Sequence, residues 1–321
     1  MAAIGGRLAG RTGAMPTADK LVVIGLLGLP LLLDLLFIWA PALSSVVLSF
    51  TRWNGIGGLH TRACSPPPAP SILQNGCWYG VQNYHQAATI YPPFWPAVAH
   101  NIIWLLVFLF IATPLGMLFA VLIDTGIRGS RIYQSVLFLP VMLSLALIGI
   151  VWEFVYSQNF GLINTVIGHT GNGNAIDWLG NPRLDLWAVL AEGSWRQAGY
   201  VMVLYLAGLK AVDPTLREAA LIDGASGWRT FWRVIFPVMR PINIVILVVT
   251  VIESLRAFDL VYITNGGNNG LELLSALVTQ NIVGEVQRIG FGSSLGVVLL
   301  VVALVPISAF LYQMLRREER T

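Results

Sequence analysis

The sequence predicts an all-α membrane protein with six transmembrane helices and a cytoplasmic helix–Gly–helix loop between the fourth and fifth. Two bulk properties support this fold class. Of the 321 residues, 56% are hydrophobic and only 11% are charged, and the mean hydropathy is +0.71. Soluble domains carry about 25% charged residues, so this composition indicates a chain surrounded by lipid. The third observation is the recurrence of apolar runs of about 20 residues or more, each long enough to cross a bilayer as a helix.

Six apolar runs define the predicted membrane domain, which extends over residues 21–315. The predicted helices cover residues 21–50, 98–123, 132–156, 187–210, 242–263 and 290–315. Residues 1–20 and 316–321 are expected to form short cytoplasmic tails. A cleavable signal peptide is the alternative interpretation of the first run. That run is longer than the apolar core of about 7–15 residues that such peptides contain, so we expect an uncleaved helix.

Basic residues predict the orientation of these helices. Most of the 19 lysines and arginines fall in the two tails and in the connections after the second and fourth helices. The opposite connections hold only Arg52, Arg62, Arg183 and Arg288. Cytoplasmic loops are enriched in positive charge, so both termini and the loop at residues 213–241 are predicted to be cytoplasmic. The formal net charge of +3 is spread over span ends and does not indicate nucleic-acid binding.

The long connection at residues 51–97 is predicted to lie on the outer, oxidising side. It contains the only two cysteines of the chain, Cys64 and Cys77. The sequence leaves open whether they form a disulfide that closes a small hairpin or remain two free thiols. His60 and His85 are nearby, but the spacing fits no standard zinc site. No metal is therefore expected on this chain.

The segment at residues 213–241 is charged and interrupted by glycine. Asp213 can cap a first helix, and Gly224 is a natural position for that helix to end. Ser226 can cap a second helix, which Pro237 would end. The apolar stripe of this second helix consists of Trp228, Phe231, Trp232, Ile235 and Phe236. The pattern predicts a helix–Gly–helix elbow at the membrane surface, and on pattern alone a loop that simply lies in the interface is the favoured interpretation.

The elbow also contains an ordered set of small and acidic residues. The set is Glu218, Ala219, Ala220, Asp223, Gly224 and Pro237. Its order and spacing resemble the EAA loop of the permease subunits of ABC importers. Val234 and Phe236 depart mildly from that loop, which usually has Ile and Leu there. In that family the loop fits into a cleft of the ATPase, so the resemblance implies that these six residues couple the chain to ATP hydrolysis.

The resemblance covers nearly the whole chain from about residue 20. Gly80–Tyr84, Gly161–Asn164 and Arg256–Asp259 are similar to stretches of the carbohydrate-importer branch, of the maltose/glycerol-phosphate type of first permease. The Pro- and Cys-containing insertion at about residues 55–78 is longer than usual. The resemblance implies a location in the bacterial cell membrane. It also implies an assembly with a second six-span permease, two ATP-binding cassette subunits and an extracytoplasmic substrate-binding protein or lipoprotein.

The same resemblance implies that this chain has no catalytic site and no cofactor, and that ATP and Mg are bound by the partner ATPase subunits. The sequence agrees with this, because no phosphate-binding loop of the GxxxxGK[ST] type occurs in it.

Charged side chains within the predicted membrane helices form a second group of candidate residues, since a charge in a bilayer is costly and usually paired or functional. Glu192 and Arg196 are four residues apart, which predicts an ion pair on one helix face. Arg256 lies three residues from both Glu253 and Asp259, so we expect it between two carboxylates. Ion pairs that tie helices together fit the same pattern as a wet pathway for a hydroxyl-rich ligand. The candidate pathway residues are Glu192, Trp195, Arg196, Tyr200, Glu253, Arg256 and Asp259.

Two other function classes were weighed against an importer permease. The sequence Gly224–Gly227 spells the GxSG of rhomboid-type intramembrane proteases, but every histidine precedes the serine, so the expected serine–histidine order is missing. A secondary transporter or channel subunit would often show an internal repeat, and none is evident. We therefore predict a permease whose cargo is a sugar or related polyol. Glycerol phosphate is the alternative, because Arg196 or Arg256 could meet a phosphate.

Overall fold

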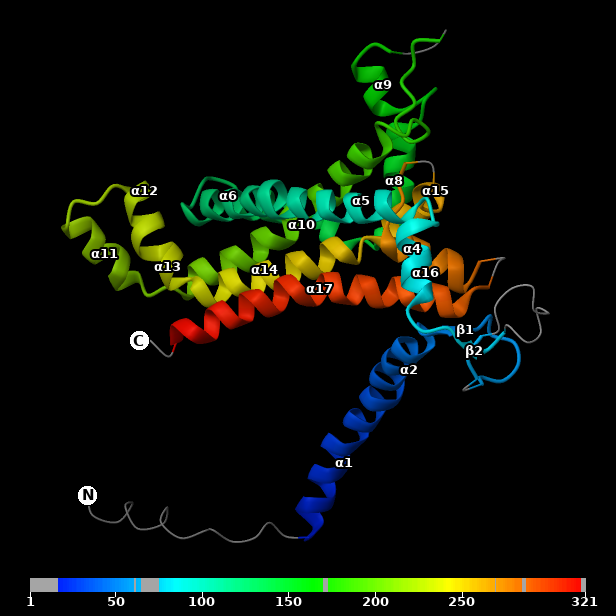
Figure 1. The fold of residues 1–321 in the computed structure, drawn as a ribbon. Coiled ribbons are helices and arrows are strands. Elements are labelled where there is room, and N and C mark those ends of the chain that lie inside the picture. Colours follow the sequence, from blue (N-terminus) through cyan, green and yellow to red (C-terminus); the bar gives the residue numbers. More distant parts are fainter. Residues whose placement is uncertain are drawn as a thin grey trace.

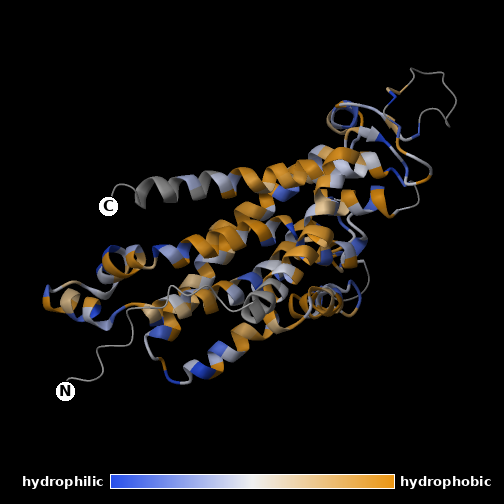
Figure 2. Cartoon of the chain, turned by 90° about the horizontal axis from the view of Figure 1, so that it is seen from below, coloured by the Kyte–Doolittle hydropathy of each residue, from blue (hydrophilic) through white to orange (hydrophobic). Residues whose placement is uncertain are grey.

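The computed structural model describes residues 17–60, 62–64, 75–169, 173–268, 270–284 and 287–318. In this part of the chain the regular elements are helices, apart from the short strands β1 (Thr51–Arg52) and β2 (Cys77–Trp78). Figure 1 shows long helices running between two ends of the molecule. One end carries the two strands and α4 (Gln82–Thr89), and the other carries α11 (Pro214–Ile222) and α12 (Gly227–Thr230). Figure 2 shows hydrophobic residues along the helices and hydrophilic residues concentrated toward these ends.

The N-terminal helix stands apart from the rest of the bundle. It consists of α1 (Thr17–Asp34), a π-helical turn η1 (Leu35–Trp39) and α2 (Ala40–Leu48). The most hydrophobic part of Gly25–Leu48 is 0% buried. Its α2 portion packs against α17 (Ile289–Glu318), while Figure 1 shows α1 diverging from the other helices. An apolar helix without protein around it is suited to contact lipid or another membrane helix. The predicted tail residues 1–16 and 319–321 lie outside the described part of the chain.

Three unbroken helical stretches among the described residues are long and apolar enough to cross a membrane. They are Gly25–Leu48, Phe94–Asp124 and Ile289–Ser308. The second consists of α5 (Phe94–Val107), a π-helical turn η2 (Phe108–Ala112) and α6 (Thr113–Asp124). Two further candidates are bent pairs of helices, which raise the number to five if each pair crosses once. The prediction of six continuous apolar helices is therefore met only in part.

The first bent pair replaces the predicted third helix. It comprises α7 (Ser130–Met142) and α8 (Leu145–Tyr156), which meet at 103°. Pro140 lies in the last turn of α7, where it disturbs the helix, and the Ser144 hydroxyl accepts a hydrogen bond from the Leu147 amide at 3.2 Å to start α8. The prediction of one continuous helix here is wrong, because a proline followed by a helix cap starts a new direction.

The predicted fifth helix is also divided. It comprises α14 (Arg240–Leu255) and α15 (Phe258–Asn265), with Arg256 and Ala257 between them. The helix before it, which ends at Val238, is bent by 77° relative to the Arg240–Asn265 segment. The expected continuous helix over this region is wrong, so spacing along the sequence does not give the relative positions of side chains on the two sides of Arg256.

The predicted fourth helix is α10 (Asp185–Ala211), a 27-residue helix that packs against α6, α7 and α14. It is about 40 Å long at 1.5 Å per residue, enough to cross a bilayer. Glycines allow its close packing. A Cβ atom at Gly116 of α6 would lie 2.6 Å from the Ala198 carbonyl oxygen, and one at Gly199 would collide with the Leu137 carbonyl of α7. Small residues at helix contacts are the usual means of close packing in membranes.

The end of the bundle that carries the two strands has its own core beneath α4. Short helix α16 (Leu274–Ile282) packs against α5 and α17, and its Leu274 and Leu277 are fully buried with Phe291 and Leu295 of α17. Helix α9 (Leu162–Val166) follows α8 and lies away from this core in Figure 1. This end of the bundle is therefore a packed unit rather than a set of free loops.

Candidate functional site: the elbow and the charged helices

Side-chain caps begin both helices of the elbow. The Asp213 carboxylate accepts a hydrogen bond from the Thr215 amide at 2.9 Å and starts α11. This bond holds the pKa of Asp213 below its ordinary value, because it stabilises the charged form. The Ser226 hydroxyl accepts from the Arg229 amide at 3.4 Å and starts α12. Both predicted helix starts are confirmed.

Between the two helices the chain turns at Gly224, which has a φ of +71°. The Gly224 amide donates to the Leu221 carbonyl at 3.0 Å, and the Ala225 amide donates to the Ala220 carbonyl at 2.9 Å. This pair of bonds closes a helix C-terminus in the arrangement known as the Schellman motif, which needs a left-handed residue at the glycine position. Glycine adopts that conformation without strain, so the predicted end of the first helix is confirmed.

The predicted coupling residues occupy both faces of the elbow. Ala220 is buried, at 6% exposure, on the helix that packs against the π-helical turn η3 (Phe231–Ile235). The other five are exposed: Glu218, Ala219, Asp223, Gly224 and Pro237. Large apolar side chains are exposed beside them, with Leu221 at 67%, Ile222 at 86% and Trp228 at 75%. The elbow therefore presents an apolar and acidic surface to its surroundings.

A carboxylate at the end of α6 anchors the elbow. Asp124 accepts a hydrogen bond from Arg217 of α11 at 2.8 Å and forms an ion pair with Lys210 of α10 at 2.9 Å. Arg217 also donates to the Leu209 carbonyl at 3.2 Å. One carboxylate thus joins α6, α10 and the first elbow helix. Sequence reasoning missed Asp124, because its partners are 86 and 93 residues away in the chain.

A mostly apolar cavity of about 450 Å³ lies beside this anchor. Met117 and Leu118 of α6 form one wall, and Trp228, Phe231 and Trp232 of the second elbow helix form another. The rings of Trp228 and Trp232 meet edge to face at 5.6 Å, which orders the aromatic wall. The predicted apolar stripe therefore packs toward α6 in part and is exposed in part, since Ile235 is buried while Trp228 is not.

Arg196 of α10 pairs across helices. Its guanidinium lies 3.6 Å from the Glu253 carboxylate of α14. The predicted pair between Glu192 and Arg196 on one helix is wrong, because among the described residues Arg196 has its ion pair with Glu253. Glu192 is 1% exposed, and its Oε1 has no hydrogen-bond partner in the described part of the protein. Helical spacing could not reveal this, because the choice depends on the neighbouring helix.

The predicted arrangement of Arg256 between two carboxylates is also wrong. Within the described ranges no ion pair joins Arg256 to Glu253 or Asp259. The helix break places Arg256 after α14 and Asp259 in the first turn of α15. Arg256 is exposed, whereas both carboxylates are half-buried.

Polar groups nevertheless gather along α10. Trp195 is 40% exposed and meets Trp152 edge to face at 5.8 Å, and Tyr200 is half-buried one turn further on. The Gln197 amide donates to the Thr250 hydroxyl of α14 at 3.4 Å. Several buried polar atoms near these residues have no hydrogen-bond partner among the described residues, namely Trp104 Nε1, Glu192 Oε1, Ser194 Oγ, Arg196 Nε and Gln197 Oε1. Unpartnered polar atoms in a membrane interior indicate a place where water or a polar ligand could bind.

The described residues show no evident site for a metal ion. Cys64 and Cys77 are joined in a disulfide, with Cα atoms 5.1 Å apart, so neither can act as a thiolate ligand. In the described ranges, no cluster of three His, Cys, Asp or Glu side chains could hold a metal ion.

Comparisons with known proteins agree with this architecture. Residues 21–321 match the family described as binding-protein-dependent transport system inner membrane component. The xylose/arabinose import permease protein XacH of Haloferax volcanii is 31% identical over 288 residues, which cover 89% of this chain and 85% of that protein. The trehalose/maltose transport system permease protein MalF of Thermococcus litoralis is 28% identical over 277 residues, or 86% of this chain and 88% of the relative.

A solved structure shows the same fold. It is a bacterial alginate ABC transporter in complex with an alginate pentasaccharide-bound periplasmic protein, and the matching chain gives a TM-score of 0.75 at 19% identity. The match covers 95% of this chain and 97% of that one. The likeness therefore extends over the whole membrane domain.

Proposed function

The chain belongs to the family of binding-protein-dependent transport system inner membrane components, the permease subunits of ABC importers, and we propose that with a second six-span permease it forms the path by which a sugar or related polyol crosses the bacterial cell membrane. In this proposal the broken segments α7–α8 and α12–α15 each cross once and α10 crosses once, which gives six spans. The chain itself catalyses no reaction. Partner ATP-binding cassette subunits hold ATP and Mg, and an extracytoplasmic binding protein delivers the cargo.

The elbow is the observation that carries the proposal. Its Schellman turn at Gly224 exposes Glu218, Asp223 and the apolar side chains of Leu221 and Ile222 on one short, rigid unit. These exposed apolar side chains would be removed from water if the elbow entered a cleft on an ATPase. The Asp124 anchor connects this surface to α6 and α10, so that movement of the elbow can be passed to helices of the pathway.

The distribution of charge supports a cytoplasmic elbow and cytoplasmic termini. The elbow and the disulfide-containing cap lie at opposite ends of the bundle, and the C-terminal end of α17 lies toward the elbow end in Figure 1. Most of the 19 basic residues lie in the elbow, in the two terminal tails and in the connection after the second predicted helix. All of these segments are cytoplasmic in this proposal, which fits the rule that cytoplasmic segments are positively charged. Lipid then surrounds the exposed apolar helices between the two ends.

A neutral or weakly charged, hydroxyl-rich cargo fits the described helices best. The relatives named above import xylose/arabinose and trehalose/maltose by their names. Gln197, Ser194 and Trp195 offer hydrogen bonds and an aromatic face of the kind that sugars use. Glycerol phosphate is the weaker candidate, because the Glu253 carboxylate already neutralises Arg196, the charged group on α10 best placed to meet a phosphate.

Purification of the tagged chain in mild detergent from its native host, with mass spectrometry of the copurifying proteins, tests this function. We expect an ATP-binding cassette protein and a second permease. Gly224→Trp should release the ATPase, since a Cβ at Gly224 meets nothing within 4 Å in this chain and the added ring would clash with a partner. Gly224→Asn is the matched control, because asparagine tolerates the left-handed backbone but adds little bulk.

The ligand of the copurified binding protein identifies the cargo. If the chain is recovered alone, or if Gly224→Trp keeps the ATPase as well as Gly224→Asn does, the elbow is not a coupling surface. A secondary transporter or channel subunit then becomes the better interpretation.

A further inference from the structure

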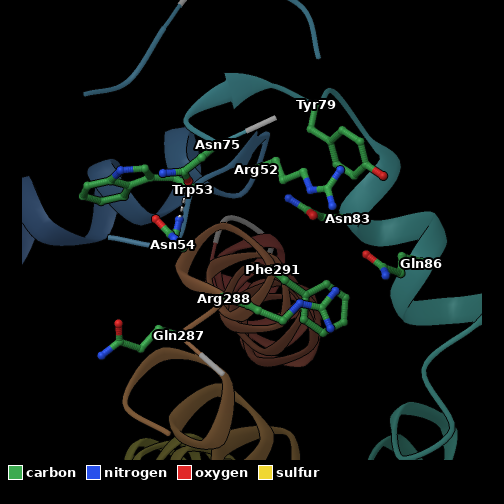
Figure 3. A pocket seen from close by; sticks show the side chains of 10 residues that line it. All are labelled: Arg52, Trp53, Asn54, Asn75, Tyr79, Asn83, Gln86, Gln287, Arg288 and Phe291. Atoms are coloured by element: carbon green, nitrogen blue, oxygen red, sulfur yellow. Dashed lines mark hydrogen bonds between the residues drawn. The ribbon is translucent and has the colours of Figure 1, made fainter. Parts of the chain in front are cut away.

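The outer end of the bundle contains a polar pocket that the transport pathway does not require. Its volume is about 350 Å³, within the range of about 300–1,000 Å³ that small-ligand sites occupy. Strand β1, helix α4 and the start of α17 form its walls, as Figure 3 shows. Strand β1 and helix α4 lie at the end opposite the elbow (Figure 1), and thus on the outer side in the proposed orientation.

The described lining of the pocket is positively charged. Arg52 and Arg288 line it, and no acidic residue is among the described residues that do. The Arg288 guanidinium lies 4.4 Å from the centre of the Phe291 ring, and the Arg52 guanidinium lies 5.7 Å from the centre of the Tyr79 ring. Stacking on the Phe291 ring uses the face of the Arg288 guanidinium and leaves its edge able to donate hydrogen bonds in its own plane.

Several donors at the pocket wall are not used by the protein itself. The Arg288 guanidinium has no hydrogen bond or ion pair to the described residues, and the same holds for the side-chain amides of Gln86 and Gln287. Gln287 has a φ of +39° and is the one non-glycine residue with positive φ in the described part of the chain. Such a conformation is costly and is often found at binding sites.

The remaining amides are committed to building the wall. The side-chain amide of Asn83 donates to the Ser49 and Thr51 carbonyls, each at 2.8 Å. The side-chain oxygen of Asn75 accepts from the backbone amide of Asn54 at 3.1 Å. The Gly290 amide at the start of α17 donates to the Trp53 carbonyl at 2.9 Å. The pocket is therefore formed by a scaffold that fixes the positions of its charged groups.

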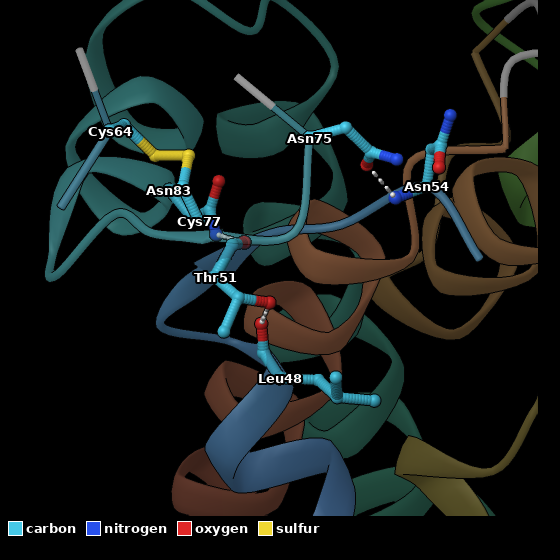
Figure 4. Close-up of a disulfide and its surroundings, with 7 residues drawn as sticks. All are labelled: Leu48, Thr51, Asn54, Cys64, Asn75, Cys77 and Asn83. Atoms are coloured by element: carbon cyan, nitrogen blue, oxygen red, sulfur yellow. Dashed lines mark hydrogen bonds between the residues drawn. A yellow bond between two sulfur atoms is a disulfide. The ribbon is translucent and has the colours of Figure 1, made fainter. Parts of the chain in front are cut away.

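The disulfide completes this scaffold. Figure 4 shows the disulfide between Cys64 and Cys77. Arg52 of β1 pairs with Cys77 of β2 in the short β-ladder, and the Gly76 amide donates to the Arg52 carbonyl at 2.7 Å. The strand that pairs with Arg52 is thus cross-linked to Cys64, so little order must be gained when a ligand binds.

We propose that this pocket binds the carboxylate of an acidic sugar, such as a hexuronate, at a site on the outer face of the permease that is separate from the membrane pathway. Guanidinium groups recognise carboxylates through paired hydrogen bonds, which accounts for Arg288, and the charge of Arg52 adds to the attraction. The amides of Gln86 and Gln287 suit sugar hydroxyls, and the rings of Trp53 and Tyr79 suit the apolar faces of a sugar ring. The proposal rests on the proposed function only in placing this end outside the cell.

Calorimetric titration of the assembled importer in nanodiscs, without binding protein or nucleotide, tests the site. Glucuronate is the probe and glucose is its matched neutral control, since the two differ only in the group at the sixth carbon. We expect glucuronate to bind more tightly than glucose and more weakly as salt is raised. Arg288→Gln should weaken glucuronate binding about tenfold or more, because it removes a charge-assisted contact. Arg288→Lys keeps the charge but loses the planar guanidinium, so its affinity for glucuronate should lie between those of the unmodified chain and Arg288→Gln.

Arg183→Gln is the control variant, since Arg183 is an exposed arginine that does not line the pocket. Equal binding of glucuronate and glucose, or equal loss in Arg183→Gln and Arg288→Gln, would overturn the proposal. So would binding that disappears in Arg196→Gln but persists in Arg288→Gln, because the sugar would then occupy the pathway.

Acetate binding as tightly as glucuronate, or an Arg288→Gln defect confined to capture of the binding protein, also contradicts the proposal. The subunit composition of each preparation is recorded, so failure of the proposed function is seen separately as a missing ATPase.

Discussion

The N-terminal helix and α10 are both long enough to cross a membrane, yet they have opposite surfaces. The N-terminal helix is strongly apolar, and the most hydrophobic part of Gly25–Leu48 is 0% buried. Helix α10 carries Glu192 and Arg196 in its middle, and 16 of its 27 residues are buried. Between these two helices, burial therefore runs against hydrophobicity.

The reason lies in the solvent. Lipid is as apolar as leucine, so an apolar surface gains nothing by leaving it for the protein interior. Polar and small residues gain, because they find hydrogen-bond partners or allow close packing only against another helix. An apolar run thus predicts that a segment crosses the membrane, while its glycines and polar residues predict what it packs against.

The largest difference between the two helices is expected in the stability of glycine variants. Gly199→Leu puts a side chain into the Leu137 carbonyl of α7, which cannot move without shifting that helix. We expect a loss of stability of about 3 kcal/mol. Gly25→Leu is the matched variant, since a Cβ there meets nothing within 4 Å. Thermal unfolding of the purified chain in detergent measures both.

Equal apparent Tm values for the two leucine variants would contradict the predicted difference between the helices. A lower Tm for Gly25→Leu than for Gly199→Leu would mean that the exposed face of the N-terminal helix is tightly covered by a partner in the purified sample.

Acidic residues on apolar helices give the next largest effect. Asp124→Asn removes the charge shared by Lys210 and Arg217, and we expect the elbow to lose about 1–2 kcal/mol of local stability, since both cations are partly exposed. Asp34→Asn is the control on the N-terminal helix, where Asp34 accepts a hydrogen bond from Trp39 at 3.1 Å and has no ion pair with a described residue. Hydrogen exchange of the α11 amides should quicken in Asp124→Asn alone. Equal exchange in both variants would show that the anchor does not hold the elbow.

A double-mutant cycle sharpens the assignment of the charges inside α10. Arg196→Gln and Glu253→Gln should show an interaction energy of about 1 kcal/mol, because the two groups are 3.6 Å apart. The cycle of Arg196→Gln with Glu192→Gln should give a value near zero. Unfolding free energies of the single and double variants supply both numbers. A larger energy for the second cycle would restore the pair within one helix.

These cases show which features a sequence reveals. The caps at Asp213 and Ser226 and the turn at Gly224 could be predicted, because each depends on residues within about five positions. Asp124 and the Arg196–Glu253 pair could not, since their partners lie on other helices. Counting charges predicts the orientation of the bundle, but that count gives no side-chain contacts.

The helix breaks lie between these extremes. Pro140 and Ser144 are both visible in the sequence as a breaker and a cap, and together they could have signalled the bend between α7 and α8. The interruption at Arg256 follows no proline or glycine, so only packing explains it. The outer pocket likewise needs β1, α4 and α17 to meet, and its residues are up to 239 positions apart, from Arg52 to Phe291.

The smallest effect is expected just beyond α10, where the first elbow helix begins. The Thr215 amide bonds to the charged form of Asp213, so the pKa of this carboxyl is lower in the folded protein than in the unfolded chain. The cap therefore stabilises α11 at neutral pH, and this contribution is lost as the pH falls through the lowered pKa, below the ordinary value of 3.8. Because Asp213 is fully exposed, the loss should melt only the first turn of α11 and leave α10 intact.

The Thr215 amide resonance, followed by NMR of the selectively labelled chain, should titrate below pH 3.8 in the native protein and not in Asp213→Asn. A midpoint above 3.8 would show that the carboxylate is not held by this bond.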